Sequence, residues 1–410
     1  MAPLATGALL LSCSSMDFGG YLDKFDGEDR GGGMYAESPD DDGGVPGEPG
    51  AGNGENGGDQ ASAGRITAGE WRDLDHWDFW SDLMLGEEFS EMSHYWRFYT
   101  DNLVAVQYTD ADEKPVIGAK VVLLKDGVSV WTAKTDNKGY AWCWASPFAA
   151  NVDLSGSKLS LNIDGTEITG QPEVTYLQSK AAVKINKYVK PASQALPKIN
   201  QVTDIAFIVD ATGSMEDEID FLKEDLVDIL GKAAEKASAE TVIRTASVFY
   251  RDIGDAYLTR VSDFSTDVTT TADFIKDQGA DGGGDYPEAV HTALETSLQK
   301  LSWGEESRMR VAFLLLDAPA HYTSEVLTSL QKSIETYARM GIRIIPIAAS
   351  GADKNTEFML RFFDILTGGT YTFLTDHSGV GGGHIKASVG DYEVEALNDL
   401  IVRLIVDVLG

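Results

Sequence analysis

The sequence has few cysteines, few basic residues and no long apolar runs. Its only cysteines, Cys13 and Cys143, lie far apart, so no disulfide framework is indicated. Only 33 Lys and Arg stand against 65 Asp and Glu, and the resulting net charge of -32 would repel nucleic acid and anionic lipid. Beyond the N-terminus no run approaches the roughly 18 apolar residues that cross a bilayer. We therefore expect no nucleic-acid partner and no membrane-spanning helix.

A short apolar stretch precedes Cys13 and ends in a small residue. Leu10-Leu11-Ser12-Cys13 resembles the lipobox of a bacterial lipoprotein signal, whose cysteine becomes the lipid-bearing N-terminus. The resemblance implies that residues 1–12 are a signal remnant. It also implies that a lipid on Cys13 is the only membrane anchor, at the outer membrane or surface of a bacterial cell envelope. No Lys or Arg precedes the apolar run, so an ordinary disordered N-terminus is the alternative.

The next two segments differ sharply in composition. Residues 13–65 are rich in Gly, Asp, Glu and Pro and predict a disordered tether, because they offer little apolar surface to bury. Residues 66–100 hold four of the eight tryptophans and show partial helical spacing, with Thr67 and Glu70 as a capping box. Such aromatics can stack on sugars, but packing against a neighbouring domain is the favoured interpretation.

Residues 101–190 alternate between apolar and polar positions, with turn signals at strand-length intervals. This pattern predicts a small antiparallel β-sandwich. Gly118-Ala119 and the turn from Thr135-Asp136 to Gly139 resemble the carboxypeptidase-regulatory or transthyretin-like class of bacterial immunoglobulin-like domains, which mostly act as spacers. Residues 191–202 contain two prolines and predict a linker.

From residue 203 to 410, apolar runs alternate with amphipathic helical segments. In the first of these helices Ile219, Leu222, Leu226 and Leu230 share one face. The alternation predicts an α/β fold, a doubly wound and mostly parallel sheet with helices on both faces. Ligands of such sheets bind at the carboxyl ends of the strands.

The first strand of this region ends on Asp210, and two hydroxyl residues, Thr212 and Ser214, follow it closely. Three hard oxygen donors at the mouth of a helix suit Mg²⁺, although a helix cap is the simpler alternative. The stretch D-A-T-G-S-M resembles the D-x-[ST]-x-S signature of a von Willebrand factor type A domain. That family holds a metal ion at its adhesion site, so the resemblance implies metal-ligand roles for this trio. It also implies such a role for Asp317, at the end of a later strand.

The family normally takes its remaining ligand from a threonine, where this chain has "DGGGDYPE" with Asp285. Together with "YRD" at Tyr250 to Asp252, that stretch resembles a bacterial subset of the family. Asp285 is therefore a candidate ligand, but Asp285 and Glu288 also fit a helix cap that needs no metal. Three carboxylates would offset a divalent ion, weaken its attraction for a partner's acid and favour a structural role, or Mn²⁺ or Ca²⁺ over Mg²⁺.

The sequence shows no catalytic constellation. The pair His377 and His384 lacks the helical spacing of a zinc protease, and Cys143 lies in an alternating strand, which is typical of a core residue. We therefore expect a non-enzymatic, metal-dependent adhesion protein of the envelope, which binds a protein or another extracellular macromolecule. The alternative is an envelope assembly or scaffold component with a structural metal.

Overall fold

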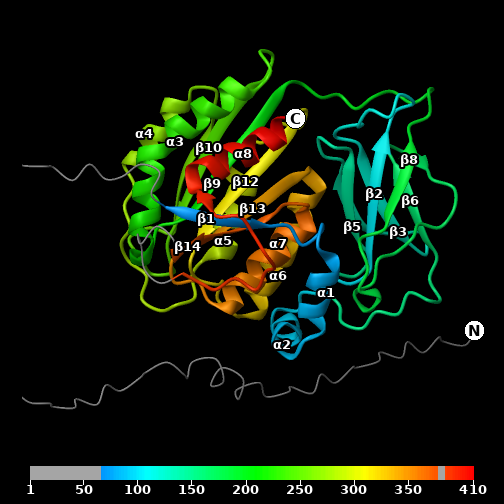
Figure 1. The fold of residues 1–410 in the computed structure, drawn as a ribbon, viewed down its shortest axis with the longest axis horizontal. Coiled ribbons are helices and arrows are strands. Elements are labelled where there is room, and N and C mark those ends of the chain that lie inside the picture. Colours follow the sequence, from blue (N-terminus) through cyan, green and yellow to red (C-terminus); the bar gives the residue numbers. More distant parts are fainter. Residues whose placement is uncertain (1–65, 377–383) are drawn as a thin grey trace, which may run out of the picture. The chain divides into compact units, whose positions relative to one another are not determined.

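The computed structural model describes residues 66–376 and 384–410, and an eight-stranded sheet is its largest element (Figure 1). The sheet has the order β11-β10-β9-β12-β13-β14-β1-β15, and the five strands from β10 to β14 in this order run parallel. Its strands are β1 (Thr67–Trp71), β9 (Val202–Asp210), β10 (Val242–Tyr250), β11 (Thr259–Ser265), β12 (Met309–Leu316), β13 (Ile342–Ala348), β14 (Tyr371–Thr375) and β15 (Glu395–Ala396). The predicted doubly wound, mostly parallel sheet is confirmed.

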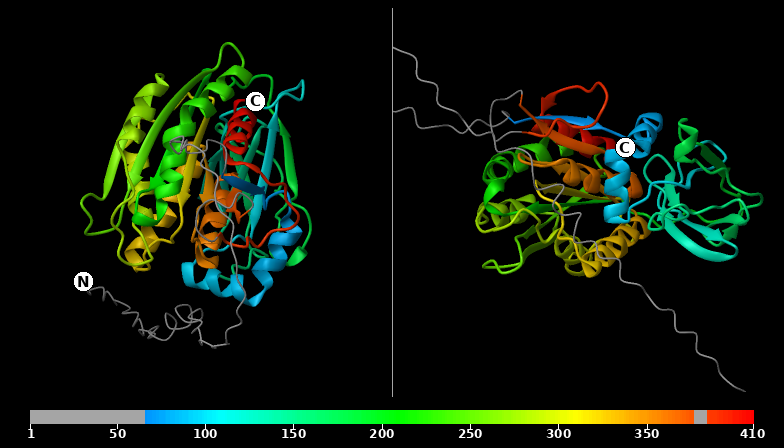
Figure 2. Two further views of the ribbon diagram at one scale, coloured as in Figure 1. Left: turned by 60° about the vertical axis from the view of Figure 1, so that its left-hand side comes forward. Right: turned by 90° about the horizontal axis from the view of Figure 1, so that it is seen from below.

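Helices cover both faces of this sheet, as the two views of Figure 2 show. They are α3 (Glu216–Lys236), α4 (Val268–Lys276), α5 (Val290–Lys300), α6 (Ser324–Met340), α7 (Lys354–Thr367) and α8 (Leu397–Leu409). The apolar residues of α3, α4 and α8 form one core with alternate residues of β9, and those of α5, α6 and α7 form the core on the other face. Every residue of β9 after Val202 is buried, because both of its faces are covered.

The predicted helix start at Thr67 is wrong, because residues 67–71 form strand β1. This strand pairs antiparallel with β14, from Thr67 opposite Thr375 to Trp71 opposite Tyr371. Pairing satisfies the backbone of β14, which would otherwise be a sheet edge, and this non-local gain outweighs the local capping signal. The α/β sheet therefore takes a strand from before the sandwich, although the sequence places its start at residue 203.

The segment after β1 does contain two helices, α1 (Trp77–Leu85) and α2 (Glu87–Trp96). All the tryptophans of these helices are buried, and Trp80 lies against Phe358 of α7. Phe98, which follows α2, is also buried and stacks on Phe362 with ring centroids 4.2 Å apart. Trp77 reaches Trp144 of the sandwich. The packing interpretation of this aromatic segment is therefore confirmed.

Residues 103–189 form two small sheets, with the orders β5-β2-β8 and β4-β3-β6-β7. Their strands are β2 (Leu103–Thr109), β3 (Lys120–Lys125), β4 (Val128–Lys134), β5 (Tyr140–Trp144), β6 (Leu159–Ile163), β7 (Thr166–Glu167) and β8 (Ile185–Val189). The predicted antiparallel sandwich is confirmed except at one pair, since β2 and β8 run parallel. The chain crosses from β7 to β8 over residues 168–184, and this long connection lets β8 enter in the direction of β2.

The remaining sequence predictions concern the two cysteines, the tether, His377 and membrane-spanning helices. Cys143 is fully buried, which raises the pKa of its thiol and agrees with a core role. Cys13, the predicted tether at residues 13–65 and His377 lie outside the described residues. In the part of the chain that is described, no helix has both the length and the apolar character needed to cross a membrane.

The turn between α7 and β14 gives the first testable prediction. A Cβ atom at Gly369 would lie 1.8 Å from the Ile344 carbonyl oxygen, which is backbone and cannot swing away. Gly369→Ala is therefore expected to destabilise the protein by about 1–3 kcal/mol, measured by chemical unfolding. Gly127→Ala is a suitable control, because nothing lies within 4 Å of its Cβ position and only its positive φ opposes the change. Equal losses in the two variants would contradict the steric argument.

Candidate metal centre

The carboxylate of Asp210 lies at the carboxyl end of β9, in the middle of the sheet. Its Oδ1 atom accepts hydrogen bonds from the Thr212 backbone N–H at 2.9 Å and from the Thr212 hydroxyl at 2.7 Å. The chain then forms a short 3-10 turn at Gly213–Met215 that leads into α3. Strand, turn and helix thus hold Asp210 and Thr212 together, as the sequence predicts.

Asp317 directly follows β12, the parallel neighbour of β9, so its side chain is brought to the same edge. Burial raises the pKa of Asp317, and the neighbouring Ser214 hydroxyl opposes that rise. Burial also raises the pKa of Asp210 to about 7, and the negative charge of Asp317 adds to the increase. The structure therefore brings together Asp210, Thr212, Ser214 and Asp317, which come from two loops.

A third buried acid at this edge is Glu288, which the sequence suggests only as part of a helix cap. Its side chain is 4% exposed, and burial together with the charge of Asp210 raises its pKa to about 9. A Cβ atom at Gly283 would lie 3.2 Å from both Glu288 Oε1 and Thr212 Cβ, so this glycine separates the two side chains. The glycine-rich loop therefore carries Glu288 to the trio.

Asp285 is placed differently, since its side chain is exposed. The predicted cap at Asp285 is wrong: α5 begins at Val290, with Ala289 in the capping position. The Glu288 backbone instead bonds to the β12–α6 loop, where its N–H donates to the Pro319 carbonyl at 2.9 Å. A role for Asp285 as a metal ligand stays a prediction.

Three buried carboxylate oxygens at this site have no hydrogen-bond partner among the described residues. They are Asp210 Oδ2, Asp317 Oδ1 and Glu288 Oε2. Unpaired buried carboxylates repel one another and are costly, and a divalent cation offsets both penalties. The described residues contain no ready-made group of three His, Cys, Asp or Glu side chains for a metal, so the hydroxyls of Thr212 and Ser214 would be needed as donors. This donor set fits a hard divalent cation.

The loop after β10 supports the site from one side, and it contains the YRD stretch. Arg251 is buried and donates to the Gly279 carbonyl at 2.8 Å, which fixes the start of the glycine-rich loop. Asp252 accepts a hydrogen bond from His321 at 2.6 Å. Asp255 Oδ2 accepts from the Gly283 N–H at 3.0 Å. No local sequence pattern indicates the roles of His321 and Asp255, because each depends on a partner from another loop.

A doubly wound sheet with acids and hydroxyls at the carboxyl ends of its central strands defines a ligand-binding α/β domain. Comparison with protein families identifies it: residues 204–356 match the model of the von Willebrand factor A domain. This part of the chain is therefore a von Willebrand factor A domain. The match includes Asp210, Thr212, Ser214, Glu288 and Asp317.

Two curated relatives share part of the chain. One is a putative ariadne-like RING finger protein of Acanthamoeba polyphaga mimivirus, 31% identical over 33% of this chain and 13% of its own length. The other is the alpha-protein kinase vwkA of Dictyostelium discoideum, 30% identical over 36% of this chain and 23% of its own length. The chain thus matches less than a quarter of either relative. Among solved structures, proximal thread matrix protein 1 from the mussel byssus is 15% identical, with a TM-score of 0.32 over 52% of this chain and 46% of that chain.

Proposed function

We propose that the von Willebrand factor A domain binds a divalent cation, Mg²⁺, Mn²⁺ or Ca²⁺, and that the loaded domain binds a protein partner without catalysing a reaction. The three unpartnered carboxylate oxygens of Asp210, Asp317 and Glu288 carry the proposal. Thr212 and Ser214 would supply the hydroxyl donors. When bound, the cation would provide positive charge that holds these loops together.

The number of carboxylates decides how the partner is recognised. The described residues hold no preformed group of three acids, so the cation would have to draw Asp210, Asp317 and Glu288 together. Three carboxylates would then more than neutralise a divalent ion and leave it little attraction for an acidic side chain of a partner. The cation would then order the β9–α3 loop, the glycine-rich loop and the β12–α6 loop, and protein side chains on these loops would make the contact. A partner that relies on apolar and aromatic contacts fits this arrangement better than one that offers a carboxylate.

Exposed apolar residues lie next to the site in three loops. Ile253 is 67% exposed and follows Asp252, while Tyr322 follows His321. Tyr286 is exposed, and the Asp353 backbone N–H donates to its hydroxyl at 3.0 Å. Tyrosine is enriched in protein interfaces, and an exposed isoleucine beside two tyrosines adds apolar surface that a partner can bury. These three residues, which we call the apolar rim, support a protein partner.

Affinity capture with the full chain tests this function. We expect the wild-type protein to retain a partner in Mg²⁺ and to lose it in EDTA, and Ile253→Asp to lose it even in Mg²⁺. Val189→Asp is the matched control, because Val189 is similarly exposed but lies in the sandwich. If only Val189→Asp lost the partner, the contact would lie on the sandwich, and its assignment to the apolar rim would be overturned.

A scaffold role with a structural metal is the second candidate, and the same carboxylate count favours it. In that case the sandwich or the aromatic segment would make the contacts. Partner capture would then survive Ile253→Asp, while EDTA would lower the thermal stability of the protein. The capture experiment therefore separates the two functions.

Attachment to a bacterial cell envelope through a lipid on Cys13 is a further part of the proposal, and it rests on the lipobox resemblance alone. Metabolic labelling with a fatty-acid analogue tests it in a bacterial host. We expect label in the wild-type chain and none in Cys13→Ser. Equal labelling of the two, or none in either, would contradict lipidation at this residue.

The third acid of the site is tested by two matched variants. Glu288→Gln is expected to weaken divalent-cation binding at least about tenfold, because it removes a buried charge beside Asp210. Asp285→Asn removes an exposed charge from the same loop and is expected to change affinity less than about threefold. Calorimetric titration of the full chain with Mg²⁺ and Mn²⁺ measures the affinities of both variants. A larger loss of affinity in Asp285→Asn than in Glu288→Gln would place Asp285 at the ion and exclude Glu288.

A further inference from the structure

A large cleft lies at the opposite end of the sheet from the metal centre. Its volume is about 910 Å³, and its walls come from β1 and the loop after it, the sandwich, the amino ends of β13 and β14, and α8 with the loop before it. Arg343 is the second residue of β13 and Thr370 directly precedes β14, whereas Asp210 ends β9. Because these strands are parallel, the cleft and the metal centre lie at opposite edges. Its size is that of a small-molecule site, and such sites often form between domains.

Two buried polar atoms on the cleft wall have no hydrogen-bond partner among the described residues. They are the indole Nε1 of Trp142, in the sandwich, and the hydroxyl of Thr370, in the α/β domain. The two side chains are only 7% and 5% exposed, so bulk water has little access to them. Of the unpaired buried polar atoms of the described residues, these two lie on the wall of the cleft, so they are the donors that a hydrogen-bond-accepting ligand there would use.

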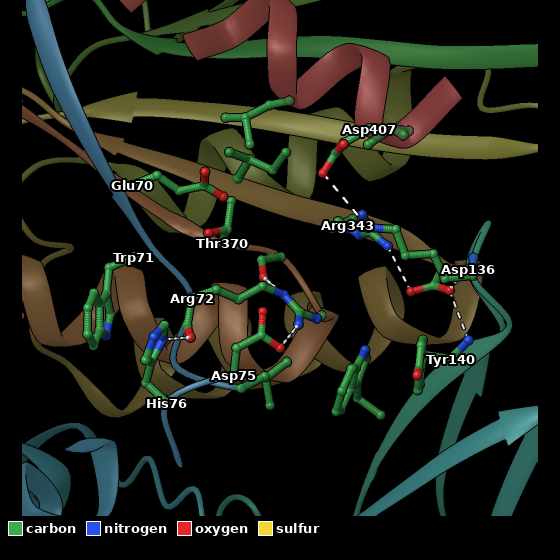
Figure 3. Close-up of a pocket in the computed structure, with 18 of the residues that line it drawn as sticks. Glu70, Trp71, Arg72, Asp75, His76, Asp136, Tyr140, Arg343, Thr370 and Asp407 are labelled. Atoms are coloured by element: carbon green, nitrogen blue, oxygen red, sulfur yellow. Dashed lines mark hydrogen bonds and ion pairs between the residues drawn. The ribbon is translucent and has the colours of Figure 1, made fainter. Parts of the chain in front are cut away.

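The charged residues of the cleft are largely paired with one another. Arg343 donates to Asp136 at 2.8 Å, and Arg72 donates to Asp75 at 2.6 Å. Figure 3 shows the first pair on one side of the cleft, and the second pair with Thr370 on the other. Two further pairs are Arg403–Glu70 and Lys138–Asp407. The inner walls are therefore rich in donors and acceptors, and each of their acids has an ion-pair partner, although Glu70 and Glu395 share Arg403.

The unpaired charge of the cleft lies at its mouth and is negative. Asp391 and Glu393 are both exposed, and neither has an ion-pair partner in the part of the chain that the structure describes. They disfavour an anionic ligand by repulsion. The many charged side chains of the walls also disfavour a purely apolar ligand, because it would bury them without hydrogen bonds. The paired walls fit a neutral ligand that both donates and accepts hydrogen bonds. A cationic ligand, which the acids at the mouth would attract, is the alternative that the experiment below separates.

Aromatic rings complete the lining. Tyr140 stacks with Trp142 at a centroid distance of 5.8 Å, and Trp71 stacks with His76 at 4.0 Å. Tyr392 is 39% exposed on the loop before α8. Sugars combine adjacent hydroxyl groups, which suit paired carboxylates and guanidiniums, with C–H faces that pack on aromatic rings. We propose that this cleft, between the sandwich and the amino ends of β13 and β14, binds a neutral oligosaccharide.

Calorimetric titration of the full chain with three neutral trisaccharides, maltotriose, cellotriose and N,N′,N″-triacetylchitotriose, tests the proposal. The wild-type chain is expected to bind at least one of them with a Kd of about 10 μM to 1 mM. Thr370→Val keeps the side-chain shape, removes the unpaired hydroxyl and is expected to weaken that binding at least about tenfold. Thr328→Val makes the same change on the exposed face of α6 and should bind like the wild-type chain.

Asp210→Asn should bind the sugar like the wild-type chain, because Asp210 lies at the opposite edge of the sheet from the cleft. Failure of the metal proposal would therefore leave the sugar-binding result unchanged. The fully deacetylated, cationic glucosamine trimer is the discriminating probe. Binding of that trimer alone would show a cation site and overturn the proposal. It would also be overturned by no binding of any neutral sugar at about 10 mM, or by unchanged binding in both Thr370→Val and Trp142→Phe.

Discussion

Replacing Arg361 by methionine is expected to lower the free energy of unfolding by about 3–5 kcal/mol, because the buried Asp73 loses its ion-pair partner and the buried Glu357 keeps only Lys354. The Arg361 side chain is fully buried in α7. It donates from Nε and Nη2 to Asp73, at 2.9 and 2.6 Å, and from Nη1 to Glu357 at 3.0 Å. The same nitrogen donates to the Ser388 carbonyl at 2.7 Å.

This arginine joins three segments that are far apart in the sequence. Asp73 follows β1, Glu357 lies in α7, and Ser388 belongs to the segment that leads to α8. The Ser388 N–H also donates to Glu357 at 2.7 Å, so the cluster fixes the chain on both sides of α7. Loss of the guanidinium would therefore loosen the attachment of β1 and of the C-terminal segment, and it would leave Asp73 without an ion-pair partner.

Urea unfolding followed by tryptophan fluorescence measures the loss. Arg403→Met is the matched control, because Arg403 also binds two acids, Glu70 and Glu395, but its side chain is 45% exposed. Exposed pairs contribute about 1 kcal/mol or less, so the control should stay near the wild-type value. Similar losses in both variants would show that burial does not set the strength of the Arg361 cluster.

Replacing Asp210 by asparagine is expected to abolish measurable divalent-cation binding. The change keeps the Oδ1 atom that accepts from Thr212 but removes the negative charge at the centre of the site. It also ends the repulsion between Asp210 and the neighbouring Asp317 and Glu288, so the metal-free variant should be at least as stable as the metal-free wild type. A change that disrupts the fold would lower both the cation affinity and the stability of the metal-free protein. Measuring the two together therefore separates loss of a ligand from unfolding.

Two measurements test this prediction. Calorimetry with Mg²⁺ and Mn²⁺ reports binding directly. Thermal unfolding reports the linked stabilisation, which for the wild type should be about 2.7 kcal/mol at a cation concentration 100 times Kd and zero for the variant. Asp267→Asn is the control, since asparagine caps α4 as well as the native aspartate. Equal stabilisation of wild type and Asp210→Asn would exclude Asp210 as a ligand.

Local sequence pattern was enough to predict the parallel sheet and part of the metal centre. Asp210, Thr212 and Ser214 lie within five residues, so one strand-to-helix turn brings them together. Asp317 follows a strand whose last six residues are all apolar, and parallel strands end at a common edge. The family signature supplied the same residues. These predictions needed only periodicity and the direction of the strands.

Predictions that depended on distant partners failed. The capping pattern of Thr67 and Glu70 is sound as local chemistry, yet the open edge of β14 recruits those residues as a strand. The cap assigned to Asp285 fails because the Glu288 backbone bonds to the β12–α6 loop and delays the start of α5 until Val290. In both places backbone pairing across the fold outweighs a capping signal of about 1 kcal/mol.

By itself, the sequence determined the fold class, the alternation of apolar strands and amphipathic helices from residue 203 on and one edge of acids and hydroxyls, because these follow from periodicity and short spacings. Only the tertiary structure decided that Glu288 is the third buried acid, that β1 joins the sheet ahead of the sandwich and that Trp142 and Thr370 share a cleft. Each of these depends on residues far apart in the chain. Their meeting is set by packing and by the pairing of buried polar groups, which no local pattern encodes.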